Sequence, residues 1–520
     1  MSWTYDTLGR VLSKTQVSNG NTKTIAYQYN SFGQLAQITT PTNKVIVYGY
    51  ANGKVSSITV SGTTVLNNVV YEPFGPVGGW TWGNGTLAVR TYDLDGRVSQ
   101  VDSAGLRTYT PDNADRITQI VDAQNSALNQ SYGYDNLDRL TSVTKSSGNQ
   151  SFTYDANGNR LTYTDGAASS TYVIASASNR LTSITGSQAR TYSYNAVGNV
   201  TAYGSTTLAY SDRERLKSAT VSGAVWNYYH NGFGERVRKK LAPSGNHYYV
   251  YDEAGHLIGE YNGNTLIQET VWLGDIPVAT LRGSSIYYVH TDHLNAPKKV
   301  TQVNNGVRWS WDRDPFGTTT VNENPAGLGT FSYNLRLPGQ FYDAETGLNY
   351  NYFRDYDPAI GRYLESDPIG LMGGTNTYFY ADVNPVTKAD PFGLCPFCLV
   401  IPGICAGGAC EAGLVLLGLG GVFSTPAGQD AATDAAKALS DAMQQCPTDD
   451  FCIRNAQRLN AERNFLTDAE ALALPMRDKE TFIAINNDIL KFNREVASHN
   501  KLCPRLKVLP LPTLGQKGLL

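Results

Sequence analysis

The feature that most constrains the fold of this 520-residue chain is a short motif that recurs along its first half. Each copy begins with tyrosine followed by Asp or Asn, reaches a turn-forming residue four positions after the tyrosine, usually glycine, and then continues into a new apolar stretch. Copies begin at Tyr5, Tyr29, Tyr92, Tyr134, Tyr154, Tyr194 and Tyr251. Between residues 139 and 256 the spacing is about twenty residues, and such a period indicates a repeat architecture.

Each copy of the motif predicts a β-hairpin. Alternation such as Tyr132-Gly-Tyr134 places both rings on one face of a strand. The Asp or Asn side chain then starts a turn, glycine supplies the position with positive φ, and residues such as 139–144 form the second strand. Because one hairpin is unstable alone in water, the units are expected to pair edge to edge into one winding sheet.

Composition agrees with this interpretation and divides the chain. Fifty glycines and 33 tyrosines are typical of many short strands joined by tight turns. All tyrosines precede residue 395 and all seven cysteines follow residue 394, so a domain boundary is expected there. The net charge of −3 does not indicate a nucleic-acid partner. The opening MSWTYDTLGR lacks a secretory signal and already lies within a repeat, which favours synthesis in the cytoplasm and a truncated or displaced cassette.

The block from Pro338 to Leu394 has a second pattern. Asp-Pro recurs at Asp357, Asp367 and Asp390, and the last two copies begin the pentapeptide Asp-Pro-x-Gly-Leu. Proline fixes its own φ and disfavours helix at the residue before it, so each aspartate is expected on a stiff turn.

These repeats and this block resemble RHS/YD-repeat proteins and their RHS repeat-associated core. The resemblance implies a β-hairpin shell around an enclosed polypeptide, as in teneurins and the C subunits of insecticidal toxin complexes. We therefore expect a mainly β protein, a spiralling YD-repeat shell or RHS cocoon followed by a small, mainly α domain. The expected domains are the repeats at 1–335, the core at 336–394 and a variable effector at 395–520.

The resemblance also implies an aspartate-dependent autoprotease in the core. Asp367 and Asp390 would be the catalytic carboxylates, and the bond between Leu394 and Cys395 would be cut. Two carboxylates near one peptide bond can serve as acid and base, because their mutual repulsion separates their pKa values. Arg362 is the expected supporting residue, through a bidentate ion pair. On spacing alone, turn-capping aspartates and a structural Arg362 are the favoured alternative; the family pattern favours catalysis.

A metal site is the less favoured interpretation of His290, Asp292 and His293. Imidazole and carboxylate suit zinc or iron. Strand alternation, however, would place His290 and Asp292 on one face and His293 on the other. Polar turn residues are therefore expected here, with no metal or cofactor.

The tail leaves its own function open. Residues 397–423 are apolar enough to cross a bilayer, but Pro402 and several glycines weaken a helix, so a membrane-inserting segment and an enclosed linker remain alternatives. Residues 427–500 are expected to be mainly helical. The Cys395-Pro-Phe-Cys398 spacing lacks the βαβ context of a redox site. The tail has no clustered histidines and no excess of basic residues, so its composition does not indicate a nuclease.

The expected function is that of the C-terminal part of an RHS polymorphic toxin, secreted or delivered to a competing cell. Its expected partners are a cognate immunity protein, a secretion-system spike or a longer N-terminal RHS region, and a membrane target of the tail. The alternative is a non-enzymatic YD-repeat cell-surface or carbohydrate-binding protein with a membrane-anchoring tail.

Overall fold

The computed structural model describes residues 1–73, 76–241, 245–394, 399–400 and 414–415. The chain divides into the units Met1–Cys398 and Leu399–Leu520. The first unit contains an antiparallel sheet of 31 strands and a sheet of four strands, which confirms the mainly β prediction. In the second unit, Leu399–Val400 (β36) pairs with Leu414–Val415 (β37). The predicted helical domain lies outside the described residues.

In the large sheet each strand pairs with its neighbours in the sequence, from β1 to β31. The first nine strands are Ser2–Tyr5, Val11–Ser18, Asn21–Tyr29, Leu35–Thr39, Val45–Ala51, Lys54–Val60, Thr63–Tyr71, Val77–Trp82 and Leu87–Tyr92. Strands β10 to β23 are Val98–Asp102, Leu106–Pro111, Ile117–Asp122, Gln130–Tyr134, Leu140–Lys145, Gln150–Tyr154, Arg160–Asp165, Ala168–Ile174, Leu181–Gly186, Arg190–Tyr194, Val200–Tyr203, Thr206–Tyr210, Leu216–Val221 and Ala224–His230, with a 3₁₀ turn η1 at Ser126–Leu128. Strands β24 to β31 are Arg236–Leu241, Asn246–Tyr251, Leu257–Asn262, Thr265–Leu273, Ile276–Arg282, Ser285–Thr291, Pro297–Gln302 and Val307–Ser310.

The Asp of each motif organises its turn, as Asp135 shows. Its Oδ1 accepts hydrogen bonds from the backbone N–H groups of Leu137 (2.9 Å) and Arg139 (3.1 Å). Asp138 has a φ of 60°, a conformation that most other copies of the motif give to glycine. The ladder shifts register directly before Tyr134, so a β-bulge accompanies the turn. The motif is therefore a self-capped turn that fixes the hairpin register.

The motif also joins consecutive repeats. The hydroxyl of Tyr154 donates to the carbonyl oxygen of Leu140 (2.7 Å), and the Arg139 guanidinium lies 5.2 Å from the Tyr154 ring centroid. Equivalent hydroxyl-to-carbonyl bonds are made by Tyr29, Tyr50, Tyr71, Tyr92, Tyr134, Tyr194 and Tyr210. The recurring tyrosine thus binds one hairpin to the hairpin before it.

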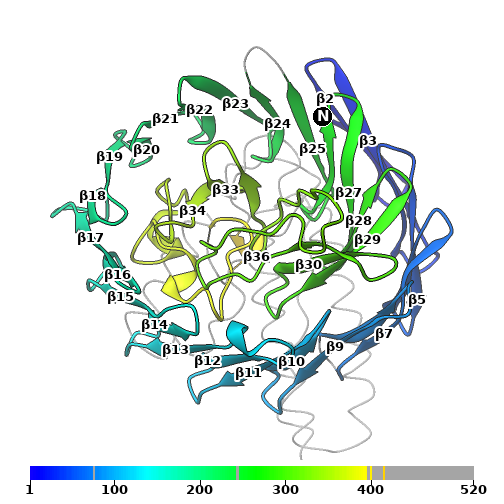
Figure 1. Cartoon of the computed structure of the whole chain (residues 1–520). Helices are drawn as coiled ribbons and strands as arrows, with labels where there is room; N and C mark the ends of the chain where they lie inside the picture. The colour runs from blue at the N-terminus through cyan, green and yellow to red at the C-terminus, as the bar shows by residue number, and fades with distance from the viewer. Residues whose placement is uncertain (74–75, 242–244, 395–398, 401–413, 416–520) are drawn as a thin grey trace, which may run out of the picture. The chain divides into compact units, whose positions relative to one another are not determined.

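The two ends of the large sheet overlap. Figure 1 shows the first strands (blue) alongside β25–β29 (green), and a shared apolar cluster fills the space between the two layers. Its members include Ile46 and Ile58 from the first layer and Val278 from the second. In β28 every residue except Arg282 is buried, because that strand has a layer on each face. The sheet therefore curls past a full turn and covers its own apolar face.

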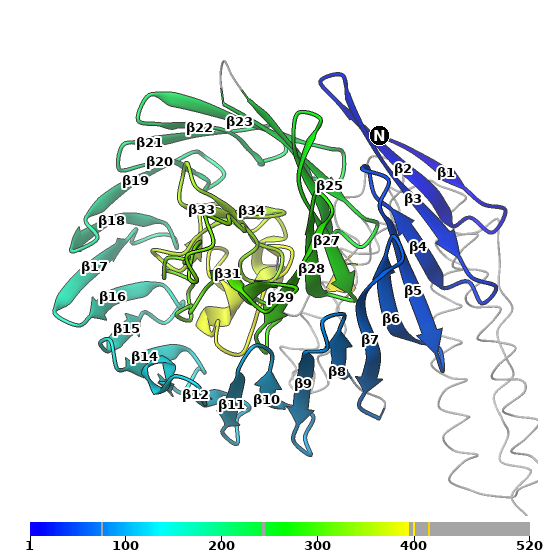
Figure 2. The ribbon, with the colours of Figure 1, turned by 45° about the vertical axis from the view of Figure 1, so that its right-hand side comes forward.

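The core block lies inside this curl (Figures 1 and 2). Its small sheet comprises Phe341–Asp343 (β32), Leu348–Asn351 (β33), Arg354–Asp357 (β34) and Arg362–Tyr363 (β35), followed by the 3₁₀ turns Gly370–Gly373 (η2) and Ala381–Val383 (η3). Leu348, Ile360 and Leu364 pack against side chains of β10–β23. The large sheet therefore surrounds the segment that carries the two Asp-Pro-x-Gly-Leu motifs.

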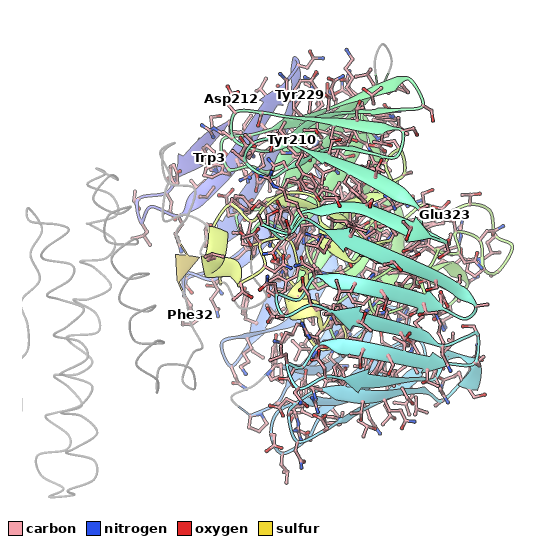
Figure 3. The ribbon with its side chains drawn as sticks, turned by 90° about the vertical axis from the view of Figure 1, so that its left-hand side faces the viewer. Trp3, Phe32, Tyr210, Asp212, Tyr229 and Glu323 are labelled. Carbon is pink, nitrogen blue, oxygen red and sulfur yellow. The ribbon has the colours of Figure 1, made fainter. Side chains whose placement is uncertain are left out.

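The motif turns lie along one edge of the large sheet. Phe32 and Asp212 belong to two of these turns, and Figure 3 shows both at the same edge. The core block contacts this edge, since a Cβ atom at Gly158 would lie 3.7 Å from Phe379, and the Tyr378 hydroxyl donates to the carbonyl of Gly198 (2.7 Å). The motif turns thus support the segment between the two aspartate motifs.

Across the described parts of the chain, no helix combines the length and apolar content needed to cross a bilayer. The apolar segment 397–423 lies outside the described residues except for β36 and β37.

We predict that Ile46→Ala lowers the free energy of unfolding by about 2–5 kcal/mol, because it leaves a cavity between the two overlapping layers. The neighbouring Val47, on the other face of β5 and 38% exposed, is the matched control. Val47→Ala is expected to cost no more than about 1 kcal/mol. Urea midpoints followed by tryptophan fluorescence compare the two. Equal losses would contradict the two-layer packing.

Candidate active site

The site is built where residues 390–394 cross the β33–β34 hairpin. Asn351 Nδ2 donates to the carbonyl oxygen of Asp390 (2.8 Å), and the backbone N–H of Phe353 donates to that of Phe392 (3.1 Å). A Cβ atom at Gly339 would lie 1.7 Å from the carbonyl oxygen of Pro391, so only glycine fits there. These contacts hold the second aspartate motif against the small sheet.

One guanidinium joins both aspartates. Arg354 Nη2 lies 2.9 Å from Asp367 Oδ2 and 3.1 Å from Asp390 Oδ2, and all three side chains are 2% exposed. Its Nε donates to the carbonyl oxygen of Gly393 (2.6 Å) and its Nη1 to that of Thr377 (3.1 Å). Arg354 therefore links both carboxyl groups to the backbone directly before Leu394.

The Tyr363 ring completes the surroundings of Arg354. It lies 3.7 Å from the guanidinium carbon, and its hydroxyl donates to Asp390 Oδ2 (2.9 Å). Burial and the charge of Asp390 raise the pKa of Tyr363 well above its usual range, so the phenol keeps its proton and remains a donor.

Leu394 lies between the two aspartates. Its backbone N–H donates to Asp390 Oδ1 (3.0 Å). Its carbonyl oxygen and Asp367 Oδ2 both lie over the bare Cα of Gly373, where an added Cβ atom would be 2.7 Å and 2.4 Å from them. One aspartate therefore holds the amide of Leu394 and the other lies beside its carbonyl.

Asp367 is the carboxyl group suited to carry a proton. Burial raises its pKa to about 7, with a further rise from the nearby charge of Asp390, while Arg354 and the N–H of Ile369 oppose the shift. Asp390 instead accepts hydrogen bonds from three donors, Arg354, Tyr363 and the Leu394 amide. The two carboxyl groups thus differ in environment although their motifs are alike.

The structure brings together three of the residues that the sequence singled out, namely Asp367, Asp390 and Leu394. Cys395 lies outside the described residues. Arg362 is placed elsewhere: its Nη2 donates to the carbonyl oxygen of Asn179 (2.7 Å), and its guanidinium lies 4.8 Å from the Tyr378 ring centroid. Within the described chain it forms no ion pair with either aspartate.

Sequence reasoning missed Arg354, Tyr363 and Asn351. The available signal was that Arg354 lies three residues before Asp357 of the first Asp-Pro, whereas Arg362 lies four residues after its proline. Only the fold of the β33–β34 hairpin decides which arginine faces the aspartates. The first Asp-Pro has a separate structural role, since Asp357 pairs with Arg190 (3.0 Å) and caps its own turn at Ala359.

The residues weighed as a metal site have separate partners. His290 Nδ1 and Nε2 contact Ser103 Oγ (3.2 Å) and Thr301 Oγ1 (2.9 Å). Asp292 pairs with Arg313 (2.8 Å), and His293 Nε2 contacts the carbonyl oxygen of Val386 (2.7 Å). Among the residues that the structure describes, no group of three or more His, Cys, Asp or Glu side chains is arranged to hold a metal ion.

Known families match parts of this sequence. The family model described as Teneurin YD-shell matches residues 273–383, and the model described as RHS Repeat matches residues 5–45, 92–127 and 131–170.

Two curated relatives match part of this chain and are longer than it. The chain is 33% identical over 202 residues to the double-stranded DNA deaminase toxin A of Burkholderia cenocepacia, which covers 39% of this chain and 14% of that protein. It is 37% identical over 117 residues to the toxin protein Tse5 of Pseudomonas aeruginosa, which covers 22% of this chain and 8% of Tse5. The chain thus spans only a small part of either relative.

A solved structure has the same fold. The structure of the Tc holotoxin pore of Photorhabdus luminescens superposes with a TM-score of 0.62 at 18% sequence identity, covering 75% of this chain and 23% of that one.

We predict that Gly373→Ala removes the close approach of Leu394 to Asp367, because the new methyl group would overlap both oxygen atoms. Any reaction at the Leu394 carbonyl should slow by about 100-fold, since a misplacement of about 1 Å can have that effect. Gly232→Ala is the matched control, because nothing lies within 4 Å of its added Cβ atom. Intact-mass spectrometry of the purified chains checks the result; equal extents of backbone cleavage at Leu394 in both variants would contradict the geometry.

Proposed function

This chain is an RHS/YD-repeat protein, and from that premise we propose that its core cuts its own backbone after Leu394. The observation that carries the proposal is the single Arg354 guanidinium between Asp367 and Asp390, with the Leu394 amide held by one carboxyl group and its carbonyl beside the other. Two carboxyl groups on either side of Leu394, one holding its amide and one beside the carbonyl of the bond to be cut, are an arrangement suited to aspartate-dependent hydrolysis.

The two aspartates have different roles in this reaction. Asp367, protonated in part near neutral pH, donates a proton to the Leu394 carbonyl oxygen as water attacks the carbonyl carbon. Asp390 accepts the proton of that water while holding the Leu394 amide. The bond between Leu394 and Cys395 breaks, the leaving nitrogen takes up a proton, and the products are a carboxyl group on Leu394 and an amine on Cys395. Arg354 positions both carboxyl groups and holds the Gly393 carbonyl.

We propose further that the cut separates a C-terminal effector, residues 395–520, from the shell and core. Support comes from the relatives, several of which are named as toxins. In this proposal the chain is made in the bacterial cytoplasm and delivered to a competing cell. A secretion-system spike or a longer N-terminal RHS region carries it, and a cognate immunity protein protects the producer.

Asp367→Asn and Asp390→Asn are each predicted to abolish the cut, with at least a 100-fold slower rate as an order-of-magnitude expectation, because an amide neither donates an acidic proton nor accepts one from water. Arg354→Lys keeps the charge but loses the planar fork, so a roughly tenfold slower cut is expected. Fragment masses over time measure each rate, with circular dichroism to verify the retained sheet.

Asp357→Asn is the matched control, since this Asp-Pro aspartate pairs with Arg190 away from the site. Complete cutting in both Asp367→Asn and Asp390→Asn would assign these residues to turn geometry. Cells making the uncut Asp390→Asn chain should grow normally, whereas the wild-type chain should inhibit growth in the absence of an immunity protein.

The pH dependence follows from Asp367. Because its pKa is raised to about 7, the rate of cutting should fall as pH rises through that value and the acid form is lost. The same shift makes the folded state hold a proton that the unfolded chain releases above about pH 4. The free energy of unfolding should therefore decrease as pH rises from about 4 to 7. Cutting rates and urea midpoints from pH 5 to 9 measure both; a rate that increases above pH 7 would contradict an acid role for Asp367.

A further inference from the structure

Two further carboxyl groups, Asp355 and Glu365, are buried directly behind the site. Asp355 follows Arg354 in β34, and Glu365 lies two residues before Asp367. They are 5% and 2% exposed. Neither belongs to any ion pair formed within the described part of the chain. Buried acids without a cation partner are rare, because an ionised carboxylate in such a place is costly.

The pair connects the two segments that carry the site. Glu365 Oε2 accepts a hydrogen bond from the backbone N–H of Asp355 (2.7 Å), and the carbonyl oxygen of Asp355 accepts one from the N–H of Leu364 (3.0 Å). Arg354 and Asp367 lie on either side of this junction, one residue before Asp355 and two after Glu365. This junction therefore sets the distance between the Arg354 guanidinium and the Asp367 carboxyl group.

The surroundings favour a protonated pair. Glu365 Oε1 is buried without a hydrogen-bond partner, which is costly for an ionised carboxylate. Tyr210 belongs to β21, which is labelled in Figure 1, and the residue itself is labelled in Figure 3. Its hydroxyl faces Glu365 and donates its proton to the carbonyl oxygen of Val200 (2.8 Å). Its interaction with Glu365 lowers the pKa of that acid, but burial has the larger effect and raises it.

Burial outweighs the effect of the charged neighbours on the pair. Those that face it are Arg215 after β21, Arg236 of β24, Asp343 of β32, Arg354 of β34 and the phenols Tyr203 and Tyr210. Arg236 is paired with Asp343, and Arg354 with the two site aspartates. Burial, reinforced by the charge of Glu365, raises the pKa of Asp355 well above its usual range, and burial raises that of Glu365 to about 7.

We propose that Asp355 and Glu365 hold a shared proton at neutral pH and act as a positioning pair that keeps Arg354 in place against Asp367 for the cut. This inference rests on the self-cleavage proposed above. When the proton is lost, the two like charges repel across the junction, and the β34 segment moves away from the segment that carries Asp367. The pair thus adds a second alkaline limit to cutting, separate from the titration of Asp367 itself.

Glu365→Gln tests the pair, because glutamine keeps an acceptor for the Asp355 N–H and needs no proton. The full-length chain, collected in denaturant before folding, is diluted into buffers from pH 5 to 9, and fragment formation is followed over time. Above pH 7 the rate should fall less steeply in Glu365→Gln than in the wild-type chain, by about tenfold instead of up to about a hundredfold per pH unit, because Asp367 still titrates but the pair no longer does. A purely electrostatic effect on Asp367 would instead lower the midpoint of the decline and leave its steepness unchanged, since removing a nearby negative charge lowers the pKa of that acid. The steepness of the decline therefore separates positioning from simple charge.

Two variants control for structural effects. Asp357→Asn removes another buried acid of β34, one that pairs with Arg190, and should leave the alkaline decline in place. Glu365→Leu removes the acceptor for the Asp355 N–H and should slow the cut by roughly tenfold at every pH. Circular dichroism verifies folding of each variant.

A spectroscopic measurement detects the proton directly. In the uncut Asp390→Asn chain at pH 7, the infrared carbonyl absorption of protonated carboxyl groups should decrease when Glu365→Gln is added. If the wild-type chain cuts but Glu365→Gln leaves the steepness of the alkaline decline unchanged, the positioning role is refuted and self-cleavage stands. If the wild-type chain does not cut at any pH, self-cleavage fails and the positioning role fails with it, while the infrared band still decides whether the pair holds a proton.

Discussion

The buried guanidinium of Arg354 is the interaction on which the arrangement of the core depends. It contacts Asp367, Thr377, Asp390 and Gly393, which come from three separate stretches of the core block. Removing two carboxylates and a cation from water costs several kcal/mol per ion, and their attraction repays this only with well-matched hydrogen bonds. Such a cluster persists only where the surrounding structure prevents relaxation.

The large sheet provides that constraint. Its strands pair only with their neighbours in the sequence, so an open sheet of this kind would leave an apolar face in water. The tyrosine hydroxyl bond between consecutive hairpins, such as Tyr154 to Leu140, fixes the position of each repeat relative to the last. The overlap of the first strands on β25–β29 covers the outer face, and the core block fills the inner face. The reactive segment is thus held within a closed set of contacts.

The repeats were predictable from sequence because their determinants are local. Tyrosine alternation, an Asp side chain and one positive-φ residue specify a hairpin within about ten residues. The convergence of Asp367, Asp390 and Leu394 also followed from the family pattern. The overlap of the sheet ends did not, since Gln16 contacts the carbonyl oxygen of Tyr249 across 233 residues of sequence. No local pattern encodes a contact of that separation.

The role of Arg354 depended on the same kind of information. Arg354 and Arg362 flank one Asp-Pro at similar distances, and both are buried. The hairpin register places the first beside the aspartates and the second beside Asn179 and Tyr378. The pairing of Asp355 with Glu365 could not be predicted from the sequence either, because ten residues and a turn separate them.

The three Asp-Pro turns show how one local motif acquires different chemistry. Each aspartate lies on a stiff turn, as proline requires. Asp357 meets Arg190 of the shell, Asp390 meets three donors, and Asp367 shares a single guanidinium and lies beside a peptide carbonyl. Because the backbone is alike, the raised pKa of Asp367 arises from its burial, with a further rise from the nearby charge of Asp390. The turn determines where a carboxyl group stands, and the fold around it determines whether that group caps, accepts or donates.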